Sequence, residues 1–462
     1  MEILNTIFLV IYFLFIIGMT VFVQSPKDKS DYLAGGHNVG TVSTALSVAA
    51  TWIWAPALFV SAEKAYMNGY AGLLWFLVPN IICLLLFIPF AIRLRNKMPY
   101  GFTISQLMNE TYGRKVKNIY VTQLSLLSLL STIVQLVAGG KIISIMTGIP
   151  FYLTTIILGG VALFYSLNKG IRASIFTDAI QMVLILLACF ILVPMAININ
   201  GIQPITEGFK GIGHDTTLFN HNGIELMLAF GIPTTIGLIA GPFGDQNFYQ
   251  RIFSVKRDKI KQSMILGAIA FAIVPIGMGI LGFTAAGIGY KGADTSVINF
   301  ELIRAILPQW AGVVFLFVLL SGLLSTIDSN LNSISSLVND VVKDARVSHL
   351  KWAMVILTVA SITLSNIDMT IVDFFLIYGI LRATTFGTTV MTLLGYEFKA
   401  NGVFYGVLVA LVVGVPTFVY AKINDILWLN ISASIFTLVI SVIIAMLHKK
   451  LSGGNRIENR TV

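Results

Sequence analysis

Long runs of apolar residues, separated by short polar segments, recur along the whole chain of 462 residues. A helix that crosses a bilayer needs about 20 mostly apolar residues, and most of these runs are of that length. The pattern therefore predicts an all-α membrane protein. Thirteen transmembrane helices are expected, at residues 4–24, 42–62, 70–92, 119–140, 150–168, 174–197, 226–249, 262–289, 305–339, 352–367, 369–392, 402–421 and 425–447.

The composition supports this reading. Hydrophobic residues make up 56% of the chain, charged residues 11%, and the mean hydropathy is +0.86. Soluble domains carry about 25% charged residues, so a water-soluble core cannot hide this much apolar surface. Cys83 and Cys189 both lie in apolar runs, which gives no reason to expect a disulfide or a metal ligand.

The basic residues predict an orientation. Lys and Arg concentrate in cytoplasmic loops of membrane proteins. With the N-terminus outside and the C-terminus cytoplasmic, 23 of the 30 Lys and Arg face the cytoplasm and 6 face outside, and Arg382 alone lies within a span. This bias also accounts for the formal charge of +9 without a nucleic-acid partner.

Two spans carry residues that interrupt a helix. In the second, Pro56 lacks an N–H and pushes Ala55 away from helical geometry, so carbonyls at 50–53 are expected to lose their helical partners. The seventh, "AFGIPTTIGLIAGPFGDQ" at 229–246, holds two prolines and four glycines. Broken helices survive in a membrane only where they are buried or line a cavity.

The second and seventh spans are five apart, and interrupted helices at matching places in two halves indicate an inverted-repeat transporter. We therefore expect an organisation in four parts. These are an extra N-terminal helix and loop at 1–40, a first five-helix repeat at 41–200, a second inverted repeat at 201–398, and two extra helices with a cytoplasmic tail at 399–462.

Ionisable residues inside a membrane are costly and usually functional. Asp178 and Asp328 stand out because both lie well within predicted spans. Near Asp328, one helix face presents small residues and hydroxyls at spacings of three and four, which suits a small alkali cation better than helix packing alone. The residues of this face are Gly322, Ser325, Thr326 and Ser329.

Arg382 is the one cation within a predicted span. It either meets a solute carboxylate through two hydrogen bonds or pairs with Asp373 as a structural charge, and of these we expect the structural pair. Asp245 lies near the inner end of its span and is expected at the interface.

At this point the chain resembles the sodium:solute symporter family, whose members share the leucine-transporter fold of two inverted five-helix repeats. The resemblance rests on "ALSVAATWIWAP", "FTDAIQMVLIL", "GDQNFYQRIF" and "LLSTIDSNLNSISS". It implies a sodium site made by residues of the second and ninth spans. The expected ligands are the carbonyls of Ala50, Ile53 and Gly322 and the hydroxyls of Ser325 and Thr326.

The resemblance also implies a second cation site in some members, which matches Asp178, Ser325 and Ser329 here. This chain departs from those members because Asp328 stands where they tend to have serine. The second site, at Asp178, Asp328 and Ser329, is therefore expected to hold either a second sodium ion or a proton.

"TWIWA" looks most similar to the urea and polyamine branch of the family. Two indoles at a helix break would form a flat apolar slot with N–H donors, which suits a small planar or amide-like solute. The residues expected to bind the solute are Trp52, Trp54, Gln135, Thr234, Thr235, Gly237 and Arg382.

We therefore expect a secondary active transporter of the plasma membrane that couples inward sodium movement to uptake of a small polar organic solute. Its expected partners are sodium, the solute and membrane lipid, and it is expected to act as a monomer. A proton-coupled carrier on the same fold and a transporter-like membrane sensor remain alternatives. An enzyme is not expected, because all five histidines lie in loops or at span ends.

Overall fold

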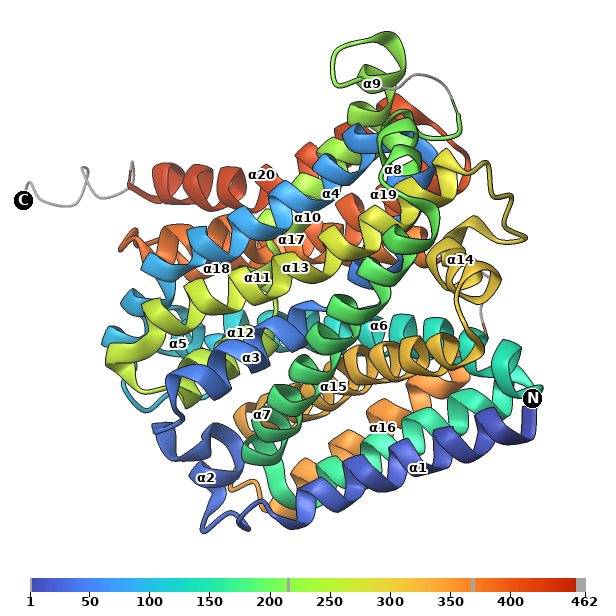
Figure 1. Cartoon of the computed structure of the whole chain (residues 1–462). Coiled ribbons are helices and arrows are strands. Elements are labelled where there is room, and N and C mark those ends of the chain that lie inside the picture. The colour runs from blue at the N-terminus through green and yellow to red at the C-terminus, as the bar shows by residue number, and fades with distance from the viewer. Residues whose placement is uncertain (1, 214–216, 367–369, 454–462) are drawn as a thin grey trace, which may run out of the picture.

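The computed structural model describes residues 2–213, 217–366 and 370–453, and every named element in these ranges is helical. The end of the predicted cytoplasmic tail, 454–462, lies outside them. Long helices run side by side through the molecule (Figure 1). Within the described ranges, eleven helices are long and apolar enough to cross a membrane. The predicted all-α, multi-pass architecture is confirmed.

The long helices account for most of the bundle. They are α1 Glu2–Val21, α4 Ala55–Lys97, α6 Arg114–Thr147, α7 Phe151–Asn200, α13 Ile260–Gly287, α15 Gln309–Val341, α16 Val347–Leu364, α17 Ile371–Leu393 and α20 Leu427–Gly453.

Shorter elements form the broken spans and the connections. The α-helices are α2 Lys29–Ala34, α3 Thr41–Trp52, α5 Ile104–Tyr112, α8 Gln203–Glu207, α9 His221–Leu226, α10 Ile232–Ile239, α11 Gly241–Gly244, α12 Gln246–Ser254, α14 Ile298–Ile306, α18 Ala400–Val409 and α19 Val415–Ile423. The π turns are η3 Met227–Gly231 and η6 Ala410–Gly414, and the 3₁₀ turns are η1 Gly35–His37, η2 Gly208–Lys210, η4 Arg257–Lys259 and η5 Thr295–Val297.

Two of the long helices contain sharp turns. In α4 and α7 the backbone leaves helical geometry at Gly69 (φ 59°) and Gly170 (φ 61°). Residues with a side chain rarely adopt these values. A Cβ at position 69 would also lie 2.0 Å from the carbonyl oxygen of Phe209. Each helix thus joins two predicted spans without a loop.

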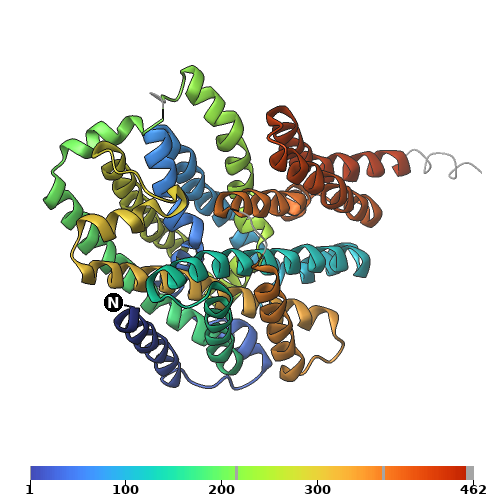
Figure 2. The ribbon, with the colours of Figure 1, turned by 90° about the vertical axis from the view of Figure 1, so that its right-hand side faces the viewer.

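The centre of the bundle is α15, in which every residue from 318 to 333 is buried. It packs against α3, α6, α7 and α16. Its polar face is therefore enclosed by other helices and shielded from lipid. By contrast, α1 lies at one edge of the bundle and α18–α20 at the opposite edge (Figure 2).

Candidate functional site

The second predicted span is broken where the sequence places Pro56. Helix α3 ends at Trp52, α4 begins at Ala55, and Ile53 and Trp54 between them are non-helical. The N–H of Ala55 is donated to Gln135 Oε1 at 2.9 Å, and that of Ala57 to the Trp54 carbonyl.

These bonds leave three carbonyls without their α-helical partners. Thr51 loses the Ala55 N–H, Ile53 loses the Ala57 N–H, and Trp52 faces a proline that has none. The predicted interruption is confirmed. Both ends of the Gln135 amide have partners at the break, because its Oε1 accepts from the Ala55 N–H and its Nε2 donates to the Ser131 carbonyl.

The broken segment meets the polar face of α15. A Cβ added to Gly322 would lie 2.9 Å from the Ile53 carbonyl oxygen, so the two backbones are in direct contact. Ser325 and Thr326 follow one turn further along α15, and Ala50 is fully buried on α3. The structure places Ile53 beside Gly322, while Ser325 Oγ donates to Asp178 Oδ1 at 2.5 Å and Thr326 Oγ1 donates to the Gly322 carbonyl at 3.0 Å. Carbonyl and hydroxyl oxygens of this kind are hard donors suited to a small cation.

Asp178, expected to hold a second cation, is in contact with a buried arginine. Arg251 Nη2 lies 2.9 Å from Asp178 Oδ2, and both side chains are 0% exposed. The same guanidinium donates to Ser47 Oγ at 3.2 Å, to the Asn247 carbonyl at 3.2 Å and to Ser329 Oγ. It therefore sits among the residues expected to bind a second cation.

Asp328 faces a different set of neighbours. Its Oδ1 accepts from Asn332 Nδ2 at 2.6 Å and from Ser166 Oγ at 3.2 Å, and its Oδ2 lies 3.5 Å from Thr177 Oγ1. The three residues expected to form one site therefore have different partners. Asp178 and Ser329 contact Arg251, whereas Asp328 accepts hydrogen bonds from neutral side chains.

Arg382 lies at the other side of the break, within an aromatic box. Its Cζ lies 3.9 Å from the ring centre of Tyr378, 4.9 Å from that of Trp52 and 5.6 Å from that of Trp54. Cation–π attraction to these rings stabilises the guanidinium where water is excluded.

The expected pair of Arg382 with Asp373 was wrong. Arg382 Nη2 donates to Asp245 Oδ2 at 2.9 Å, and Asp373 Oδ1 instead lies 3.5 Å from Lys422 Nζ. Asp245 is 5% exposed rather than interfacial, because it stands where the seventh span breaks. Helix α11 ends at Gly244, α12 begins at Gln246, and Asp245 between them is extended.

The seventh span contributes the remaining predicted solute residues. Gly237 lets α10 touch α17, because a Cβ there would lie 2.5 Å from the Gly379 Cα. A narrow cleft between the two helices is lined by Thr234, Gly237, Phe375 and Arg382, among others. The hydroxyls of Thr234 and Thr235 are buried and have no hydrogen-bond partner in the described part of the chain. The indole N–H of Trp52 donates a hydrogen bond to the Asn80 carbonyl at 3.3 Å.

Sequence reasoning missed Arg251, which it assigned to a cytoplasmic loop, and Tyr378, whose hydroxyl donates to Asp245 at 2.6 Å. A signal for Arg251 was present, because it stands in the apolar stretch "FYQRIFSV" that follows the second helix break. Nothing in the local sequence around Tyr378 identified it.

The model of the sodium:solute symporter family matches residues 32–410. The chain belongs to this family. It is a membrane transporter that couples solute movement to sodium, and it is not an enzyme. In this family sodium is a co-substrate rather than a cofactor.

Curated relatives of this symporter differ in how much they share with it. The sodium/pantothenate symporter of Haemophilus influenzae is 25% identical, over 97% of this chain and 96% of its own length. The urea-proton symporter DUR3 of Oryza sativa is 21% identical over 62% of this chain, and the match spans only 43% of that protein. This chain thus spans less than half the length of that urea transporter.

Solved structures support the fold. A Na⁺-coupled sialic acid symporter in a substrate-bound outward-open state superposes with a TM-score of 0.77 at 17% identity, covering 96% of this chain and 98% of that chain. The nucleobase-cation-symport-1 transporter Mhp1 superposes with a TM-score of 0.58 at 16% identity, over 92% and 97%. At these identities the likeness concerns the fold alone.

Proposed function

We propose that this symporter takes up a small organic solute with a carboxylate group, together with one sodium ion. The observation that carries the proposal is the state of Arg382. Its Nη2 is paired with Asp245, but Nε and Nη1 are buried without a partner in the described chain. A buried donor left unpaired costs about 1–3 kcal/mol or more for a charged group, and a carboxylate is the acceptor that matches two guanidinium N–H groups.

Charge balance supports the same solute class. Arg382 and Asp245 neutralise one another, so an incoming carboxylate adds one negative charge to a buried site. Sodium bound between Ile53 and Gly322 would supply the matching positive charge on the other side of the same helix break. Because burying an unpaired charge is unfavourable, the two would bind more tightly together than either alone.

Two relatives point the same way. Pantothenate and sialic acid, in the names of two of the similar proteins, are carboxylates at neutral pH, whereas urea is uncharged. The sequence match to the pantothenate symporter also extends over nearly the full length of both chains.

A stoichiometry of one sodium rests on Arg251. Its guanidinium carries the positive charge that a second sodium ion would bring to Asp178 and Ser329. We infer that this arginine is the resident counter-ion there, and that only the site at the first helix break loads and releases sodium in each cycle.

We further propose thirteen spans, of which ten form two inverted five-helix repeats at 41–200 and 201–398. The eleven candidates, the shorter apolar helix Phe151–Leu167, and α3 with the part of α4 before Gly69 would make thirteen. We further propose an outside N-terminus and the plasma membrane as its location. Lys117 Nζ donates to the Asp340 carbonyl at 2.8 Å, so these two segments, both expected in the cytoplasm, lie on the same side of the bundle.

The orientation is tested by cysteine labelling in intact cells. In a variant with Cys83 and Cys189 replaced by serine, a cysteine at Lys64 is expected to react with a membrane-impermeant maleimide, and one at Lys115 is not. The reverse pattern would invert the proposed topology.

The solute class is tested by thermal shift with the purified symporter. Each carboxylate is screened beside its own amide, with and without sodium, and urea is included. We expect a sodium-dependent rise of Tm with one carboxylate and none with its amide. That carboxylate should then enter proteoliposomes under an inward sodium gradient, with a Hill coefficient for sodium near one. Stabilisation by urea or by amides alone would overturn the proposal, and a sodium Hill coefficient near two would overturn the stoichiometry.

A further inference from the structure

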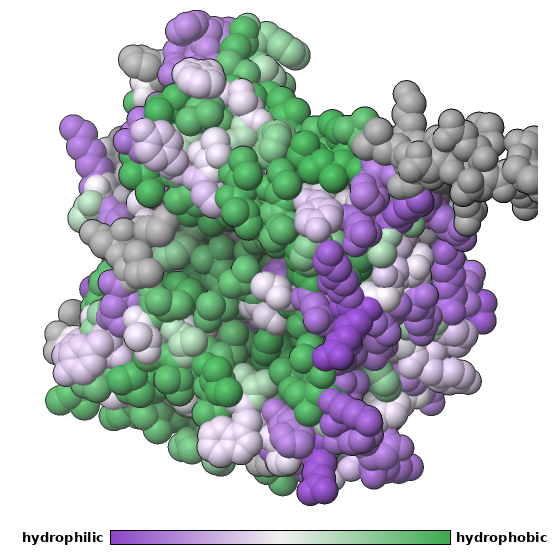
Figure 3. Space-filling model, turned by 180° about the vertical axis from the view of Figure 1, so that it is seen from behind, coloured by the Kyte–Doolittle hydropathy of each residue, from purple (hydrophilic) through white to green (hydrophobic). Residues whose placement is uncertain are grey.

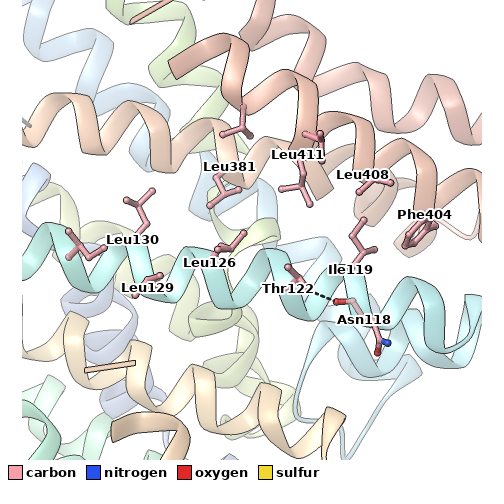
Figure 4. A pocket seen from close by; sticks show the side chains of 13 residues that line it. Asn118, Ile119, Thr122, Leu126, Leu129, Leu130, Leu381, Phe404, Leu408 and Leu411 are labelled. Carbon is pink, nitrogen blue, oxygen red and sulfur yellow. Dashed lines mark hydrogen bonds between the residues drawn. The ribbon is translucent and has the colours of Figure 1, made fainter. Parts of the chain in front are cut away.

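An apolar groove of about 670 Å³ opens on the lipid side of the bundle, away from the site described above. One wall is α6, with Leu126, Leu129 and Leu130, and the other runs through α18 and η6, with Leu408 and Leu411 (Figure 4). Its lining has no charged side chain.

The groove lies in a surface suited to lipid. Hydrophobic residues cover most of the face seen in Figure 3, and hydrophilic residues gather along its right-hand edge. Val412, which lines the groove, is 63% exposed and Leu126 is 43% exposed. A groove of this volume, with an apolar and partly exposed lining between predicted membrane spans, suits an acyl chain.

One end of the groove is lined by polar residues and lies close to basic ones. Asn118 and Thr122 line it there, one turn beyond Arg114 and Lys115 at the start of α6. The Nζ of Lys115 lies 3.4 Å from Asn401 Oδ1 and 4.3 Å from the Phe404 ring centre, so it bridges both walls. The exposed Lys399 directly precedes α18. Basic pockets between transmembrane helices bind the phosphates of anionic lipids.

The groove touches the helix that carries the solute-site arginine. Leu381 of α17 forms part of its floor, and the next residue is Arg382. On the inner side, Gln123 Nε2 donates to the Leu381 carbonyl at 3.2 Å. The other wall includes the π turn η6, and such turns occur frequently at functional sites.

We propose that this groove is a binding site for an anionic phospholipid. One acyl chain lies between α6 and the α18–η6–α19 wall, and the phosphate meets Arg114, Lys115 and Lys399. The bound lipid supports Leu381 from outside and so helps to fix where α17 holds Arg382. The site does not depend on which solute is carried.

The test uses the full-length symporter in nanodiscs that contain phosphatidylglycerol or phosphatidylcholine with a photoactivatable diazirine in the acyl chain. Crosslinked peptides are mapped by mass spectrometry. We expect labelling of 126–133 and 404–415, with phosphatidylglycerol favoured by about fivefold for each basic residue that contacts the phosphate.

Two sets of variants test separately the binding of the lipid phosphate and the binding of the acyl chain. Arg114→Gln, Lys115→Gln and Lys399→Gln together should abolish the preference for phosphatidylglycerol, whereas Lys291→Gln should not. Leu130→Trp with Leu411→Trp fills the groove and should remove its labelling. Leu187→Trp, at a position 54% exposed on α7, is the matched control and should leave it unchanged.

Three results would overturn the proposal. These are equal labelling by the two lipids in the unmodified symporter, labelling that persists when the groove is filled, and crosslinks that join two copies of the chain through the groove in place of lipid. Each variant is first checked for a monodisperse elution profile and an unchanged Tm, so that loss of labelling is not loss of fold.

Discussion

Two buried arginine–aspartate pairs flank the broken helices, and they differ in how fully the arginine is used. Arg251 and Arg382 each lie 2.9 Å from a carboxylate oxygen of their partners, Asp178 and Asp245. Arg251 also donates through Nε, Nη1 and Nη2 to other groups. Within the described part of the chain, Nε and Nη1 of Arg382 have no hydrogen-bond partner, and the guanidinium is surrounded by aromatic rings instead.

This difference separates a structural cation from a binding cation. A guanidinium whose donors are all satisfied has nothing left for a ligand, and it joins α12 to α3, α7 and α15. One with free donors in a site closed to water gains most when an anion arrives. We therefore expect loss of Arg251 to weaken the fold and loss of Arg382 to weaken solute binding.

The largest effect is expected from Arg251→Met. It leaves Asp178 buried without a positive partner, and breaking a buried ion pair from one side costs about 3–5 kcal/mol. We expect the free energy of unfolding to fall by this amount in a denaturant titration in detergent. Arg251→Met with Asp178→Asn should recover most of the loss. A single variant as stable as the unmodified protein would show that Arg251 does not compensate Asp178.

The second effect concerns Arg382. Arg382→Met with Asp245→Asn removes the charges of both partners, so the fold loses less than in the Arg251 variant. Hydrogen bonds to charged groups contribute about 1.5–3 kcal/mol each, and because two are lost we expect solute affinity to fall by at least about 100-fold. The measurement is the half-saturating solute concentration for sodium-driven uptake.

Asp245→Asn alone is the control for that variant, because it keeps the two free N–H groups of Arg382. It should lose far less affinity than the double variant. Equal losses in the two would place solute recognition on Asp245 and would remove the distinction between the two arginines.

The sequence predicted the parts of this comparison that are local. Pro56 forces the break at residues 53–54 because it lacks an N–H, and the hydroxyl face of α15 follows from helical spacing alone. Both are properties of a few neighbouring residues. The all-helical, multi-pass fold followed equally from the length of the apolar runs.

The partners of the buried charges could not be predicted this way. Arg382 and Asp245 are 137 positions apart, and the nearer candidate by span position, Asp373, was chosen wrongly. Arg251 was assigned to a loop because it follows a span, yet the extended residue Asp245 turns α12 back into the protein. Pairings of this kind depend on how helices pack, which a single sequence does not contain.

The third prediction tests the proposed sodium site, which lies between the two pairs. Gly322→Ala places a methyl group 2.9 Å from the Ile53 carbonyl oxygen, and overpacking of this kind costs about 1–3 kcal/mol. We expect the sodium concentration for half-maximal uptake to rise about tenfold, which corresponds to about 1.4 kcal/mol. Gly312→Ala on the same helix, where a Cβ has its nearest contact at 3.7 Å, should change nothing. A similar rise in both variants would mean that α15 is perturbed as a whole.

The smallest effect is expected from a third ion pair, which is open to solvent. The side chains of Lys141 and Asp294 are 40% and 35% exposed, and pairs of this kind contribute about 0–1 kcal/mol. Lys141→Met should therefore leave solute affinity, sodium dependence and the free energy of unfolding nearly unchanged. If Lys141→Met lowered the free energy of unfolding as much as Arg251→Met, burial would not determine how much each ion pair contributes to stability.

The pH dependence of the exposed pair between Lys141 and Asp294 follows from the same geometry. Burial by itself would raise the pKa of Asp294, but hydrogen bonds from Lys141 and Ser296 outweigh it and lower the pKa below its ordinary value. A carboxyl whose pKa is lowered by folding stabilises the protein above its unfolded pKa, about 3.9, and loses that contribution only as the pH falls through the folded value. Between pH 5 and 8, Lys141→Met and the unmodified symporter should therefore show parallel profiles of Tm. A difference that grows as the pH falls from 8 to 5 would mean that a group other than Asp294 titrates at this pair.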